Sequence, residues 1–176
     1  HRWKEAVKTR TTHPLAEVFG RDLWKTTLMA IAFSSVALIG TWGSVQWLPL
    51  WADKMAGQTL PQAKGITMFA MSIGAIIGCF VGPWIGARLG RRPAYFALCL
   101  ASLISCGVLF RAVSTFGAAF IVGTVLVGAF TAAFYGWLPL YLPELFPTRS
   151  RATGQGLSYN SGRILAAVGA ITQGHL

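Results

Sequence analysis

Residues 112–143 read AVSTFGAAFIVGTVLVGAFTAAFYGWLPLYLP and contain no charged side chain. A helix rises 1.5 Å per residue, so about 20 apolar residues cross the ~30 Å hydrocarbon core of a bilayer. The run is long enough to span a membrane and to supply the connections at both ends. Because it lacks the alternation of apolar and polar residues typical of a membrane barrel strand, it predicts a transmembrane helix over 117–141.

The rest of the chain repeats this pattern. Charge-free runs cover 26–52, 65–87 and 93–110, and a further run extends from 152 to the end with Arg163 as its only Arg, Lys, Asp or Glu. We therefore expect an all-α integral membrane bundle over 26–176 with about five transmembrane helices. These predicted helices lie near 27–50, 65–86, 93–110, 117–141 and 152–173.

Composition and charge support a membrane protein. Only 11% of the 176 residues are charged, against about 25% in soluble domains. The net charge of +10 comes from basic residues between the apolar runs, which indicates a membrane and not a nucleic-acid partner. If the N-terminus is cytoplasmic, the outer side holds only three basic residues, Lys54, Lys64 and Arg111, in agreement with the positive-inside rule. We predict a multi-pass protein of the plasma or inner membrane, with 1–25 as a cytoplasmic arm or loop.

Glycines at 74, 78, 82 and 86 line one face of the second predicted helix. Lipid supplies little hydrophobic force between helices, so small residues at this spacing allow the close backbone contact that holds helices together. The fifth predicted helix repeats the pattern with small residues at 158, 162, 166 and 170. Both stripes predict tight helix pairs.

An enzyme is not indicated. The sequence has no Ser/His/Asp order typical of a hydrolase, no paired carboxylates and no glycine-rich dinucleotide loop after a strand. Cys79, Cys99 and Cys106 lie within predicted spans without metal-ligand spacing, so we expect them to be small packing residues. We predict no cofactor and no metal.

Two segments resemble one family of membrane proteins. Residues 82–93 read GPWIGARLGRRP and resemble the loop signature G-x-x-x-D-R-x-G-R-R of the major facilitator superfamily, with Ala87 in place of its aspartate. Residues 141–154, YLPELFPTRSRATG, resemble the segment P-E-x-F-P-T-x-x-R-A-x-G that follows the tenth helix in metabolite transporters of that superfamily. Residues 156–163, GLSYNSGR, are similar to the start of the eleventh helix in organic-acid and sialate/lactate-type proton symporters.

The resemblance implies the C-terminal half of a twelve-helix transporter, from the central cytoplasmic loop through helix eleven. The N-terminal half and the last helix would lie outside this sequence. In the family these loops latch one conformation, and here Glu144 and Arg151 would form a state-dependent ion pair at facing helix ends. The implied conformational-switch residues are Gly86, Arg88, Gly90, Arg91, Arg92, Glu144 and Arg151.

Arg163 carries the strongest indication of a binding site. It lies about 15 Å into the fifth predicted helix, where a guanidinium costs roughly 2.5–3.5 kcal/mol on insertion scales. It therefore faces a partner or a hydrated cavity. It could clamp the carboxylate of a substrate, form a structural ion pair, or extend back to the membrane surface.

Other polar and aromatic residues of the spans are candidates for the same site. Trp42 and Gln46 form a polar-aromatic pair in the first span, and Tyr159 and Asn160 lie near Arg163 in the sequence. Phe130 and Phe134 belong to an aromatic stripe whose alternative role is core packing. The candidate substrate-binding residues are Trp42, Gln46, Phe130, Phe134, Tyr159, Asn160 and Arg163.

We predict a secondary active transporter of a small polar metabolite, an organic anion of monocarboxylate type, moved with protons by alternating access. None of the carboxylates, Glu5, Glu17, Asp22, Asp53 and Glu144, falls at mid-membrane. The proton-carrying residue is therefore expected in the N-terminal half. The expected partners are this N-terminal half, membrane lipid, a small-molecule substrate and H⁺. The alternatives are a sugar transporter of the same superfamily and a non-transporting membrane interaction or receptor subunit.

Overall fold

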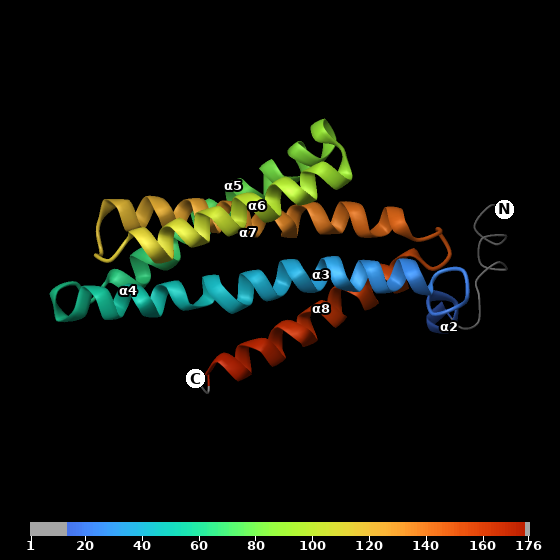
Figure 1. Cartoon of the computed structure of the whole chain (residues 1–176), viewed down its shortest axis with the longest axis horizontal. Helices are drawn as coiled ribbons and strands as arrows, with labels where there is room; N and C mark the ends of the chain where they lie inside the picture. The colour runs from blue at the N-terminus through green and yellow to red at the C-terminus, as the bar shows by residue number, and fades with distance from the viewer. Residues whose placement is uncertain (1–13, 175–176) are drawn as a thin grey trace, which may run out of the picture.

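The computed structural model describes residues 14–174, so expectations for 1–13 and 175–176 lie outside it (Figure 1). In this part of the chain all regular structure is helical, as the sequence predicts. Four segments are long and apolar enough to cross a membrane: Trp24–Ala56, Ala63–Leu89, Arg91–Ala112 and Ala118–Leu145. The fifth long helix, α8 (Arg151–Gly174), is of similar length but more polar.

The first span is interrupted near its outer end. Helix α3 (Trp24–Ser44) passes through a 3-10 turn, η1 (Val45–Trp47), into α4 (Leu48–Ala56), where the sequence predicts one helix near 27–50. The Ser44 hydroxyl donates to the Gly40 carbonyl, and Pro49 has no backbone N–H to continue the ladder. A second 3-10 turn, η2 (Gly57–Thr59), follows α4.

Helices α5 (Ala63–Leu89) and α7 (Ala118–Tyr141) form the most extensive helix pair. A Cβ added at Gly74 would overlap the Val125 carbonyl, and one at Gly78 would overlap the Ala129 carbonyl. In the opposite direction, Gly128 faces the Met71 carbonyl. The glycine stripe thus lies where two backbones meet, and this is the close approach that its spacing predicts.

The second tight pair consists of α3 and α8. A Cβ at Gly162 would lie 2.9 Å from the Ser34 carbonyl carbon, and Ser158 and Ala166 of the same stripe are buried. Figure 1 shows the two helices close near the start of α8 and diverging toward its end. Helix α6 (Arg91–Ala112) packs on α7 and α5.

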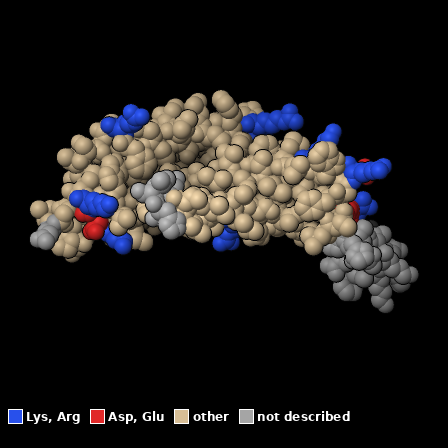
Figure 2. All heavy atoms as spheres, turned by 60° about the horizontal axis from the view of Figure 1, so that its bottom comes forward, with Lys and Arg blue, Asp and Glu red and all other residues tan. Residues whose placement is uncertain are grey.

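On the face shown in Figure 2, charged side chains lie mostly toward the two ends of the elongated molecule, and most of the middle is uncharged. One end collects the connections after α5 and α7, including the 3-10 turn η3 (Leu142–Leu145). We call it the arginine-rich end; its arginines are Arg88, Arg91, Arg92, Arg149 and Arg151.

A short helix, α2 (Pro14–Val18), is packed onto the arginine-rich end. Val18 is buried in the same core cluster as Phe146, and its carbonyl accepts a 2.7 Å hydrogen bond from the Thr27 hydroxyl. The Glu17 carboxylate pairs with Arg149. The described part of the predicted 1–25 arm is therefore docked against the bundle.

Candidate functional site

Arg163 and Trp42 meet in a pocket between the diverging helices α8 and α3. The pocket has a volume of about 190 Å³ and is completed by Ala166, Ala167 and Ala170. The alanines leave the guanidinium and the indole uncovered, and Trp42 is 41% exposed. Within residues 14–174 no ion pair joins Arg163 to a carboxylate, so the described structure does not supply the structural ion pair.

A third helix contributes Tyr135, which sequence reasoning missed. This α7 side chain is half-buried; its hydroxyl lies beside the Thr41 and Trp42 side chains and within electrostatic reach of Tyr159 and Arg163. Phe130 and Phe134, the aromatic residues predicted from the sequence, lie on another face of α7. The available signal was the single phenol between Phe130 and Leu140, a stretch whose other side-chain hydroxyl is that of Thr131.

These residues make a cationic and aromatic cluster on α3, α7 and α8. A guanidinium binds a carboxylate through two parallel charge-assisted hydrogen bonds. Phenol and indole groups add single hydrogen bonds and apolar contact area. The cluster Trp42, Tyr135, Tyr159 and Arg163 has the chemistry to hold a small organic anion.

The remaining predicted site residues lie elsewhere. Asn160 is exposed and donates to the Gly156 carbonyl of its own helix at 2.8 Å; Gln46 is exposed in η1. Phe134 is buried in the core, with its ring 5.5 Å from that of Tyr95. Phe130 lines a separate groove between α6 and α7. The structure therefore does not bring the two phenylalanines into the Arg163 pocket.

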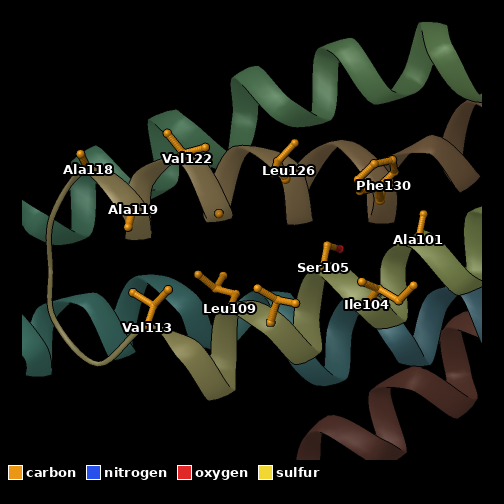
Figure 3. A pocket seen from close by; sticks show the side chains of 12 residues that line it. Ala101, Ile104, Ser105, Leu109, Val113, Ala118, Ala119, Val122, Leu126 and Phe130 are labelled. Carbon is orange, nitrogen blue, oxygen red and sulfur yellow. The ribbon is translucent and has the colours of Figure 1, made fainter.

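That groove has a volume of about 760 Å³ (Figure 3). Leu109 of α6 and Val122, Leu126 and Phe130 of α7 line it, and no charged residue does so. A surface of this kind matches lipid chains, so its size does not make it the site for a polar substrate.

At the arginine-rich end, Glu144 pairs with Arg91 in this structure, where the resemblance implies a state-dependent pair with Arg151. The Arg91 Nε donates to Glu144 Oε2 at 2.9 Å, and Nη2 donates to Oε1. Helix α7 packs along α5, so the turn that follows α7 brings Glu144 beside the residue that begins α6. Arg151 begins α8 instead and is exposed.

The other predicted switch residues surround this pair. Gly90 has φ +85°, a left-handed value that favours glycine, and it separates α5 from α6. Arg88 lies 4.9 Å over the ring of Trp84, which is a cation–π contact. Gly86 is buried under Trp137, and Arg92 is exposed.

A profile of the Major Facilitator Superfamily matches residues 2–170. The chain belongs to the Major Facilitator Superfamily. The predicted resemblance to this superfamily and the all-α membrane fold are thereby confirmed. Membership in a superfamily of multi-pass membrane transporters agrees with the predicted membrane location and with the prediction that the chain is not an enzyme.

Several transporters whose names give a substrate are similar in sequence to this chain, some over most of its length and others over part of it. A probable 4-methylmuconolactone transporter of Cupriavidus pinatubonensis is 30% identical over 87% of this chain and 35% of its own length. The 3-(3-hydroxy-phenyl)propionate transporter of Escherichia coli is 28% identical over 97% of this chain and 41% of its own length. A glucose transporter of Staphylococcus epidermidis is 32% identical over 51% of this chain and 20% of its own length.

The chain spans roughly a third of the length of the first curated superfamily members that it matches: 35%, 28% and 36%. No solved structure matches the chain significantly.

Proposed function

We propose that the chain forms the C-terminal half of a secondary transporter that moves an organic anion of monocarboxylate type across the membrane by alternating access. The N-terminal half would supply the facing bundle. The observation that carries this proposal is the position of Arg163: it lies within helix α8 and lines a pocket together with Trp42. Arg163 is exposed at this pocket and has no carboxylate partner within residues 14–174, so its guanidinium can pair with an anion.

The surrounding residues support an anion over a neutral substrate. Tyr135 and Tyr159 lie within electrostatic reach of each other and of Arg163. Among superfamily members similar to the chain, one transports a propionate by its printed name. The sugar alternative is supported by a glucose transporter that matches half of the chain; substrate competition separates the two.

Proton coupling is a further part of the proposal. Among residues 14–174 the carboxylates are Glu17, Asp22, Asp53 and Glu144, and each lies outside the central part of a span. A proton carrier needs a titratable group near the substrate, so we place it in the N-terminal half. An imposed proton gradient directed inward, with the exterior more acidic, should raise substrate uptake severalfold. Equal uptake with and without the gradient would indicate a facilitator.

Uptake by the full-length transporter in proteoliposomes tests the substrate assignment. We expect labelled monocarboxylates, but not glucose, to accumulate. Arg163→Gln should lower carboxylate uptake by about 10–100-fold, since a hydrogen bond to a charged group contributes about 1.5–3 kcal/mol. Arg163→Lys should retain part of the activity because the charge remains.

The matched control is Arg111→Gln. It removes an exposed arginine in the last turn of α6, which does not line the Arg163 pocket, and should leave uptake unchanged. Unaltered carboxylate uptake by Arg163→Gln would contradict the anion clamp. Glucose uptake that survives excess carboxylate would favour the sugar transporter, and absence of uptake for every solute would favour the non-transporting subunit.

A further inference from the structure

A second pocket lies at the arginine-rich end, away from the Arg163 pocket. Its volume is about 90 Å³, and its lining comes from α3, α6 and α7. We call it the inner aromatic pocket; its residues are Phe33, Arg91, Arg92, Tyr95, Trp137 and Tyr141.

The walls of this pocket are aromatic rings held in contact. The ring centroids of Tyr95 and Trp137 are 5.2 Å apart, and those of Trp137 and Tyr141 are 4.7 Å apart. The Tyr95 hydroxyl donates to the Phe33 carbonyl at 3.0 Å, which ties α6 to α3. The walls are therefore preorganised and present flat apolar faces.

An unpartnered hydrogen-bond donor lies in the wall of the pocket, next to Gly86. Trp137 is 1% exposed, and its indole N–H has no hydrogen-bond partner among the described residues. A Cβ added at Gly86 would lie 2.9 Å from that nitrogen and 3.6 Å from Arg91 Nη1. The orphan N–H and the Arg91 guanidinium therefore lie close to each other beside Gly86, which is not itself a lining residue of the pocket.

The charges at the pocket leave an excess of one cation. Arg91 uses Nε and Nη2 on Glu144, so Nη1 is not part of that fork. Arg92 also lines the pocket and forms no ion pair within residues 14–174. Donors and positive charge between apolar walls select an anion, because a buried donor without an acceptor is unfavourable.

We propose that the inner aromatic pocket binds the carboxylate group of a planar monocarboxylate. A guanidinium fork matches a planar carboxylate, and a flat acid can stack on the aromatic walls, whereas a tetrahedral, strongly hydrated phosphate cannot. The volume admits the carboxylate with the first atoms of its substituent. This is a site separate from the Arg163 pocket, and its occupancy does not depend on transport.

Calorimetric titration of the purified full-length transporter with benzoate tests the site. The titration uses an Arg163→Gln background, so that the Arg163 pocket does not contribute to binding. A failure of this proposal can then be distinguished from a failure of the proposed transport function. We expect benzoate binding to persist there. Arg92→Gln should weaken it about tenfold, and Trp137→Phe, which removes the N–H and keeps a ring, should weaken it severalfold.

Arg21→Gln is the matched control, because it removes an exposed arginine next to α2 that does not line the pocket; affinity should be unchanged. Equal weakening by Arg21→Gln and Arg92→Gln would show unspecific charge attraction and overturn the proposal. So would absence of benzoate binding in the Arg163→Gln background, or preferential binding of inorganic phosphate with the same variant pattern. If Trp137→Phe fails to fold, Arg92→Gln decides, since its side chain is exposed.

Discussion

Tyr135 and Arg163 show how single polar residues acquire a role through their neighbours. Tyr135 lies in a largely apolar helix, where an unpaired polar group is unfavourable, and Arg163 is the one charged residue of α8 after Arg151. The structure places the phenol beside Thr41 and Trp42 and within electrostatic reach of the guanidinium. We therefore expect Tyr135 to position the proposed anion alongside Arg163.

Replacing Tyr135 with phenylalanine should raise the KM for carboxylate uptake about three- to tenfold and leave kcat nearly unchanged. The change removes one hydrogen bond, worth about 0.5–1.5 kcal/mol, and retains the ring that packs on its neighbours. Initial rates over a range of substrate concentrations measure both constants. A fall in kcat with constant KM would instead indicate a role in the conformational change.

At the scale of elements, close backbone contact between α5 and α7 organises this half of the bundle. Gly78 is buried against the Ala129 backbone, whereas Gly65 of the same helix has open space around it. The two glycines provide a test in which the same chemical change meets different surroundings.

Gly78→Ala should lower the apparent Tm of the detergent-solubilised transporter by several degrees. The added methyl overlaps a backbone carbonyl, and overpacking of this kind costs about 1–3 kcal/mol. Gly65→Ala should leave Tm unchanged or raise it slightly, because alanine is the better helix former. Size-exclusion chromatography after heating measures the fraction of transporter that remains folded. Identical melting of the two variants would refute the close contact between α5 and α7 at Gly78.

At the scale of the whole molecule, the Arg91–Glu144 pair joins the connection after α5 to the connection after α7. Both side chains are partly exposed, 34% and 47%, so the pair contributes at most about 1 kcal/mol to stability. An interaction of that size can still shift an equilibrium between inward- and outward-open states severalfold.

Glu144→Arg and Arg91→Glu should each increase inward accessibility about two- to fivefold, and the double swap should restore the original value. The rate of labelling of Gln155→Cys in a cysteine-free background measures that accessibility from the inner side. The pairing would be disproved if Glu144→Gln behaved like Arg151→Gln and not like Arg91→Gln.

Local sequence was sufficient to identify much of this protein. The length of the charge-free runs indicates membrane helices because a bilayer has one thickness, and the loop motif around Arg88–Arg92 together with residues 141–154 indicates the family. The four-residue glycine spacing predicts the close helix contact, since that period repeats on one helix face. Each of these properties depends on residues close together in the chain.

The pairings depended on how the helices pack. Arg91 as the partner of Glu144, Tyr135 as a neighbour of Trp42, and the separation of Phe130 from Arg163 join or divide residues that are far apart in sequence. Local patterns give the face of a helix but not the rotation and crossing of one helix against another, which packing of the whole bundle determines. The chain alone therefore specified membrane helices and family, whereas tertiary packing decided which side chains form a site.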